Sequence, residues 1–121
     1  MVEPAKLPQL DQRPDVPAVN REVRRRITAD MRLRILQIVR CAPAYSTNAR
    51  LLCELLDLWG HRAAIEAVLS EVAWLQEQGV VNVRHTEFAA VVELTDRGLA
   101  VATGAIALSG VAKPGPGELH E

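Results

Sequence analysis

The stretch GVVNVRHTEFAAVVELTDRG, residues 79–98, decides the fold, because it predicts two short strands, a tight turn and the start of a helix. Its valine-rich segments VVNVRH and FAAVVELT are joined through Thr86 and Glu87, as expected for an antiparallel hairpin. Thr95 is a suitable N-cap for the helix that follows, and Asp96 lies near the positive end of that helix. A short hairpin is not stable alone, so this one must pack against earlier parts of the chain.

Apolar residues at helical spacing predict a first helix upstream of the hairpin. The helix is expected to begin near Ala18, to have a further N-cap at Thr28 and to end at Pro43. Its apolar stripe consists of Met31, Ile35, Ile38, Val39 and Ala42.

Two further helices are predicted between the first helix and the hairpin. The second follows the capping residues 46–48 and stops at Gly60, where a C′ glycine is expected. The third runs from about 62 to 78 and stops at Gly79. The inward residues expected on the third helix are Ile65, Val68, Leu69, Val72 and Leu75.

The composition predicts one domain with an aliphatic core. The chain has 121 residues, of which 49% are hydrophobic and only 3% aromatic. This length can bury a single core without disulfides or metals. No segment approaches the roughly 18 apolar residues of a membrane span, and the first residues lack the apolar centre of a signal peptide. We therefore expect a soluble, cytoplasmic protein that does not enter membranes.

Proline and glycine mark the ends of the predicted domain. Residues 1–17 contain four prolines and predict an extended N-terminal arm, and the sequence PGPG near the other end predicts a loose tail. The expected organisation is an arm over 1–17, a domain over 18–104 with a basic leading helix over 18–41, and a tail over 105–121.

Charge is distributed unevenly along the chain. Residues 21–40 contain seven basic and two acidic residues, a net +5, whereas residues 41–79 sum to −3 and residues 80–121 to −2. A polyanion would be attracted first to the arginine-rich segment. A solvated helix face with ordinary arginines is the alternative interpretation.

Three helices, a two-stranded hairpin and a short helix form the order of a winged helix-turn-helix domain, in which the hairpin is the wing. Residues 68–98, VLSEVAWLQEQGVVNVRHTEFAAVVELTDRG, resemble the winged-helix pattern of L-x-x-x-G-V-V, a wing and L-T-x-x-G. The resemblance covers about residues 28–104. It implies a mainly helical α+β fold with three helices, a two-stranded wing, a short C-terminal helix and the extended arm.

The whole chain also resembles a family of small uncharacterised proteins of Mu-like transposable bacteriophages and related prophages. The segments that carry this resemblance are GHRAAIEAVLSEVAWLQEQGVV and GVAKPGPG. This resemblance implies a phage or prophage origin and no mechanism. The winged-helix order and the arginine-rich segment motivate the first hypothesis, a regulator or accessory factor of transcription that binds double-stranded DNA.

The third helix is poorly suited to read DNA, although it occupies the place of a recognition helix. Its expected exposed face is uncharged and is flanked by Glu66, Glu71 and Glu77, which phosphates would repel. Arg62 lies at its start and Arg84 on the wing, so each is a candidate for a phosphate contact. The stronger candidates lie in the leading helix, and they are Arg21, Arg24, Arg25 and Arg26.

A protein-interaction module, either a homodimer or an assembly adaptor with another phage protein, is the second hypothesis. Ala63, Ala67, Ser70 and Trp74 share one face of the third helix, and small residues beside a tryptophan are typical of an interface. The alternative for Trp74 is that the N-terminal helix or the tail of the same chain covers the ring.

The sequence indicates no enzyme, cofactor or metal site. The three histidines show no HxxxH or HExxH spacing, and neither a glycine-rich phosphate loop nor a GxSxG motif is present. A metal sensor built from Cys41, Cys53 and His61 lacks any closely spaced ligand pair. Ordinary packing is the expected role of both cysteines, and a place in the turn between helices is expected for His61.

Overall fold

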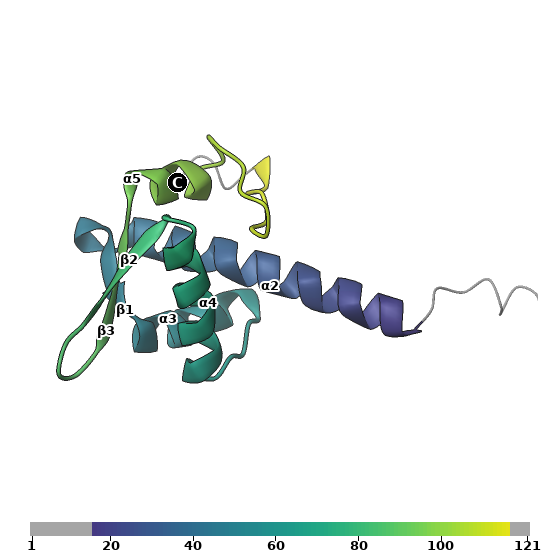
Figure 1. Ribbon diagram of the computed structural model, residues 1–121, viewed down its shortest axis with the longest axis horizontal. Coiled ribbons are helices and arrows are strands. Elements are labelled where there is room, and N and C mark those ends of the chain that lie inside the picture. Colours follow the sequence, from purple (N-terminus) through teal and green to yellow (C-terminus); the bar gives the residue numbers. More distant parts are fainter. Residues whose placement is uncertain (1–15, 117–121) are drawn as a thin grey trace, which may run out of the picture.

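The computed structural model describes residues 16–116, and Figure 1 shows their arrangement. The fold is α+β and mainly helical, with a small three-stranded antiparallel sheet. Its elements are α2 (Val16–Cys41), the 3₁₀ turn η1 (Pro43–Tyr45), β1 (Ser46–Asn48), α3 (Ala49–Leu56), the 3₁₀ turn η2 (Asp57–Trp59), α4 (Ile65–Glu77), β2 (Val81–His85), β3 (Ala90–Leu94) and α5 (Asp96–Ala102). The predicted N-terminal arm falls mostly on residues 1–15, which lie outside the described residues.

The long helix α2 is continuous from Val16 to Cys41, so the N-cap expected at Thr28 is wrong. Five of the seven residues before Thr28 are arginine or glutamate, which are good helix formers, and the helix continues through this position. Pro17 is tolerated because it lies in the first turn, where its missing N–H has no helical partner. The predicted end before Pro43 is confirmed.

The sheet contains a strand that the sequence did not reveal. β1 pairs with β3 in antiparallel register, with Thr47 opposite Val92, and β3 pairs with β2 on its other side. The prediction of two strands was therefore incomplete. β1 consists of three polar residues without apolar alternation, and only its pairing with β3 makes it a strand. The predicted capping role of Asn48 is confirmed, because its Oδ1 accepts a hydrogen bond from the N–H of Leu51 at 2.8 Å.

The predicted hairpin is confirmed as β2 and β3, with a turn over residues 86–89. The turn is closed by Thr86, whose backbone N–H donates to the Ala89 carbonyl at 2.8 Å. The Thr86 hydroxyl oxygen also accepts from the N–H of Ala89 at 3.0 Å. The apolar character of Phe88 and Ala89 had suggested that they belong to the second strand. In the structure both residues belong to the turn.

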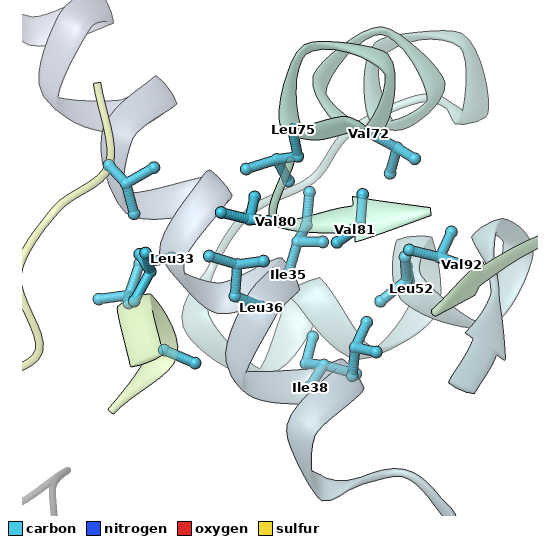
Figure 2. Packing of buried hydrophobic residues seen from close by; sticks show 14 of the residues in the cluster. Leu33, Ile35, Leu36, Ile38, Leu52, Val72, Leu75, Val80, Val81 and Val92 are labelled. Carbon is cyan, nitrogen blue, oxygen red and sulfur yellow. The ribbon is translucent and has the colours of Figure 1, made fainter. Parts of the chain in front are cut away.

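The core is aliphatic, as the composition predicted. Figure 2 shows side chains from α2, α3, α4 and the sheet meeting at its centre. The residues with essentially no exposed surface are Ile35, Leu36, Val39, Leu52, Leu56, Val68, Leu75, Val80, Val81 and Val92. Ile65 was expected to point inward, but it is 37% exposed because it begins α4 at the edge of the fold.

The L-T-x-x-G sequence joins α5 to the start of β2. The Thr95 hydroxyl donates to the Gly79 carbonyl at 2.8 Å and accepts from the N–H of Gly98 at 3.0 Å. Gly98 is buried so close to β2 that a Cβ at this position would lie 2.0 Å from the Val80 carbonyl oxygen. The predicted Thr95 cap is confirmed, and Gly98 is required by close approach of two backbones.

Part of the expected loose tail, residues 108–112, returns to the fold next to α2, although residues 105–107 are exposed. Val111 is buried, Leu108 packs against the core, and the N–H of Ala112 donates to the Ala29 carbonyl at 3.0 Å. The prediction relied on prolines and glycines that begin only at Pro114, beyond these apolar anchors.

Candidate functional site

The N-terminal half of α2, residues 16–27, extends beyond the other elements of the fold (Figure 1). We call this segment the projecting half. Its side chains are exposed, except that Ala18 and Glu22 are half-buried. It spans about 18 Å, given about 1.5 Å per helical residue. Because few other residues cover this segment, its arginines and its aliphatic side chains, which lie on different sides of the helix, are both exposed to solvent.

The four predicted arginines of this helix lie together on the projecting half. With about 100° between successive residues, Arg21, Arg24 and Arg25 share one face of the helix. We call this the arginine face. Arg21 and Arg24 form no ion pair with any residue of the described range, so their charges are available to an anion.

A single carboxylate holds the other two arginines. Glu22 Oε2 lies 2.7 Å from Arg25 Nη2 and 2.5 Å from Arg26 Nε. Hydrogen bonds from Arg25 and then from Arg26 lower the pKa of Glu22 from 4.5 to about 2, and the same contact raises the pKa of Arg25. These side chains are well exposed, so water and salt screen the pairs. Two of the four arginines, Arg25 and Arg26, therefore share one negative charge, which neutralises them only in part.

The Glu22 ion pairs give the projecting half a pH dependence. A carboxylate with a lowered pKa stabilises the helix fully above its unfolded pKa, and the contribution is lost as the pH falls through the folded pKa. We expect the loss between about pH 4.5 and about pH 2. NMR titration of the Glu22 carboxyl carbon should give a midpoint near the lower value. A midpoint close to 4.5 would show that the pairs do not form in solution.

A hollow beside the arginine face separates α2 from the returning C-terminal segment. It has a volume of about 960 Å³, with Arg21, Arg24 and Arg25 along α2 and residues 109–112 opposite. Arg32 also borders the hollow, but its guanidinium is committed to the fold. The hollow therefore adds room for an anion next to the two unpaired arginines.

Arg32 ties three parts of the chain together. Its Nε lies 2.6 Å from Glu71 Oε1 of α4, and its Nη1 donates to the Gly110 carbonyl at 3.1 Å. The guanidinium also lies 3.7 Å from the centre of the Trp74 ring, which is a cation–π contact. The pair with Glu71 is mostly buried, since the two side chains are 17% and 21% exposed.

The predicted interface face of α4 is partly covered by this contact. Trp74 is half-buried beneath Arg32 and next to Gly110, where an added Cβ would lie 2.9 Å from the ring. This arrangement matches the alternative in which the chain's own helix and tail cover the ring. Ala67 and Ser70 are exposed and Ala63 is half-buried, so the uncharged part that remains accessible is small.

The other two predicted arginines lie outside the projecting half. Arg84 is on β2, in the hairpin at the opposite end of Figure 1, and its Nη2 lies 3.5 Å from Glu93 Oε2. Arg62 is exposed before α4. Its neighbour His61 is held by Asp30 of α2, with 2.7 Å between Nε2 and Oδ2, so His61 lies between helices as predicted.

The cysteines lie on different helices and differ in exposure. Cys41 is exposed at the end of α2, and Cys53 is half-buried in α3. Within residues 16–116, no group of three or more histidine, cysteine, aspartate or glutamate side chains is placed to hold a metal ion. None of the helices in this range is long and apolar enough to span a membrane.

Two important residues of this surface were not singled out from the sequence. The sequence could have indicated the role of Glu22, because arginines three and four residues after a glutamate lie within reach of its carboxylate on a helix. No local pattern could have indicated the role of Arg32, since Glu71 and Gly110 are distant in the sequence and meet Arg32 only in the folded chain.

The fold and this surface define a class of small, mainly helical α+β proteins with a three-stranded sheet and a long, arginine-rich leading helix. No protein-family model matches the chain. Over 91 residues it is 36% identical to the uncharacterised protein gp26 of Escherichia phage Mu, an alignment that covers 74% of this chain and 93% of that protein. The chain therefore belongs to the family of this phage Mu protein, which confirms the resemblance to Mu-like phage proteins.

A second relative comes from a bacterium. The chain is 35% identical over 57 residues to an uncharacterised protein of Haemophilus influenzae, across 47% of this chain and 55% of that protein.

Proposed function

We propose that this Mu-like phage protein is a non-enzymatic winged-helix protein that binds duplex DNA in the cytoplasm of the bacterial host. It would act as a regulator or accessory factor, and its arginine face would supply most of the phosphate contacts. The order helix, strand, helix, helix, strand, strand and the sheet order β1-β3-β2 support the winged-helix assignment, with the β2–β3 hairpin as the wing.

The usual docking of α4 in the major groove is unfavourable for this chain. α4 contains three glutamates and no basic residue from Ile65 to Glu77. Duplex DNA carries one negative charge about every 1.7 Å along its axis, so these carboxylates would be repelled. Glu71 is compensated by Arg32, but Glu66 and Glu77 are exposed. The proposed contact therefore lies elsewhere on the molecule.

The observation that carries the proposal is the exposed arginine face on a helix that projects from the fold. Arg21 and Arg24 are unpaired within the described chain, and Arg25 is held only by Glu22. A phosphate could replace that glutamate as the partner of Arg25, because guanidinium groups bind carboxylates and phosphates in the same geometry. Contacts of this type position a protein on DNA without reading its sequence.

The double variant Arg21→Ala/Arg24→Ala tests the proposal. Each phosphate contact contributes about 0.9 to the slope of log K against log salt, so we expect the slope to fall by about 2 and the affinity to fall at least about tenfold. The measurement is fluorescence anisotropy of a labelled duplex over a salt series. Arg62→Ala/Arg84→Ala removes the same charge elsewhere and should have a much smaller effect.

Glu22→Gln provides an opposite control. It removes one negative charge and releases Arg25 and Arg26 from their shared carboxylate, so binding should become tighter and its salt slope steeper. If the wild-type chain binds no duplex at low salt, the proposal fails. Equal losses in the two arginine double variants would also contradict it, because the arginine face would then have no special role.

A protein-interaction module is the second candidate function. It is favoured by a row of exposed aliphatic residues on the projecting half, on a different side from the arginine face. Ala67 and Ser70 on α4 add a small uncharged surface. The two functions are compatible, because they use different faces.

A further inference from the structure

The projecting half presents an apolar face that nothing in the described chain covers. Val16, Val19, Val23 and Ile27 follow one another at intervals of three or four residues, and are 68%, 40%, 49% and 48% exposed. We call this row the aliphatic stripe. On a helix these positions share one side, centred well away from Arg21 and Arg25. An exposed row of branched aliphatic residues on one helix face is typical of a surface that binds another protein.

A groove of complementary character lies between α3, the start of α4 and the hairpin turn. Its volume is about 620 Å³, and its apolar lining includes Ile65, Leu69 and Phe88. Phe88 is 89% exposed at the tip of the hairpin, although it is one of only four aromatic side chains that can provide large contact area. We call this site the hairpin groove.

Acidic residues outnumber basic ones in the hairpin groove and next to it. Glu54 lines it, and Glu66 lies at the start of α4 next to Ile65. Burial and then the charges of Glu66 and Glu54 raise the pKa of the Cys53 thiol, which belongs to the same lining. Arg50 offsets part of this charge, with its Nε 3.8 Å from Glu54 Oε2.

We propose that the aliphatic stripe of one copy docks in the hairpin groove of a second copy, in a head-to-tail arrangement. Charge complementarity selects this occupant. The projecting half has four arginines and one glutamate, a net +3, whereas the residues in the groove lining or next to it in sequence include Glu54, Glu66 and Glu87 against Arg50 and Arg62, a net −1. Pairing of two projecting halves would bring two net +3 segments together and is therefore disfavoured.

The fold prevents a chain from filling its own groove. α2 is one straight helix whose projecting half extends away from the hairpin, at the other end of the molecule (Figure 1). The contact is thus heterologous, so it leaves a free stripe at one end and a free groove at the other, and it can extend into rings or filaments. The arginine face points away from the groove, so its charges attract the second copy at long range and stay accessible to an anion.

Two variants and their mixture test the proposal in the absence of nucleic acid. Val23→Asp inactivates the stripe and Phe88→Asp inactivates the groove, and both side chains are exposed, so the fold should persist. The interface is small and falls in the transient class, so concentrated samples at low salt are needed. We expect the mass of the wild type to rise with concentration, and each variant alone to remain monomeric in sedimentation velocity.

The mixture distinguishes head-to-tail contact from other arrangements. An equimolar mixture of Val23→Asp and Phe88→Asp retains one intact stripe and one intact groove, so it should form a dimer and nothing larger. Leu58→Asp is the matched control, since Leu58 is 76% exposed outside both surfaces, and this variant should associate like the wild type.

Three results would overturn the proposal. They are a wild type that stays monomeric throughout the series, a Phe88→Asp variant that still associates, and a mixture that fails to form a dimer. A still-associating Phe88→Asp variant beside a monomeric Val23→Asp variant would indicate pairing between projecting halves. Since no DNA is present, these results are independent of the arginine face and of the proposed function.

Discussion

Replacing Ile35 by alanine is expected to lower the free energy of unfolding by about 2–5 kcal/mol, whereas the same change at Ile27 should lower it by less than about 1 kcal/mol. Both residues lie in α2, but Ile35 has no exposed surface and Ile27 is 48% exposed. Removing the buried side chain leaves a cavity among Val80, Leu75 and other core residues, whereas water already contacts the exposed one.

Urea denaturation of dilute samples, followed by circular dichroism, provides the measurement. The loss expected for Ile35→Ala is a large part of the free energy of unfolding of a small domain, which is typically about 5–15 kcal/mol. Dilution keeps the chain monomeric, so the Ile27 variant reports on folding and not on association. Similar losses in the two variants would mean that the projecting half is packed in solution, and the aliphatic stripe would then not be available.

The sequence predicted the helices well where an apolar stripe faces a core. Ile35, Ile38 and Val39 were expected to point inward and are buried. The stripe could not locate the start of α2, because the projecting half has no core to face and its helical structure depends on local propensity and on the Glu22 ion pairs. Thr28 is a good cap residue, but a cap acts only where a helix begins.

The sheet shows the limit of local patterns more clearly. The hairpin was predicted because β2 and β3 are valine-rich and adjacent in the chain. β1 consists of Ser46, Thr47 and Asn48, and its identity as a strand depends on β3, which is far along the sequence. A strand that only completes a sheet edge leaves little trace in its own residues.

The candidate site was predictable in its charges but not in its contacts. The arginine cluster was predicted from the distribution of charge along the sequence, and the structure places its four members on one projecting segment. The cover over Trp74 could not be inferred, because Arg32 and Gly110 approach the ring from opposite ends of the chain. Tertiary contacts of this kind decide which face of a helix remains free.

The two faces of the projecting half suggest how both proposals operate in one molecule. Arginines would hold a polyanion on one face while aliphatic side chains hold the next copy on another. Head-to-tail copies would then present their arginine faces repeatedly, and the many weak phosphate contacts would add together. If both proposals hold, DNA binding should be cooperative, so the fraction of DNA bound should rise more steeply with protein concentration than for independent copies.

The close approach of α5 to the start of β2 predicts a second large loss, caused by the addition of one methyl group. Alanine normally stabilises a helix relative to glycine by about 1 kcal/mol. At Gly98 of α5, however, the new Cβ would lie 2.0 Å from the Val80 carbonyl oxygen and 2.7 Å from Leu94 Cδ1. The first of these neighbours is backbone, so no side-chain rotation can relieve the clash.

Gly98→Ala is therefore expected to destabilise the fold by about 3 kcal/mol, at the upper end of the usual cost of overpacking. The helix must move away from β2, which breaks the bond from the Thr95 N–H to the Val80 carbonyl, 3.1 Å long in the structure. Hydrogen exchange at Thr95 should accelerate accordingly.

Gly60→Ala is the matched control, because a Cβ at this position meets nothing within 4 Å. This variant is destabilised only by the left-handed backbone conformation that alanine must adopt there, at about 1–2 kcal/mol. A stabilised Gly98→Ala variant with unchanged exchange at Thr95 would mean that α5 does not rest on β2, and that the L-T-x-x-G sequence needs another explanation.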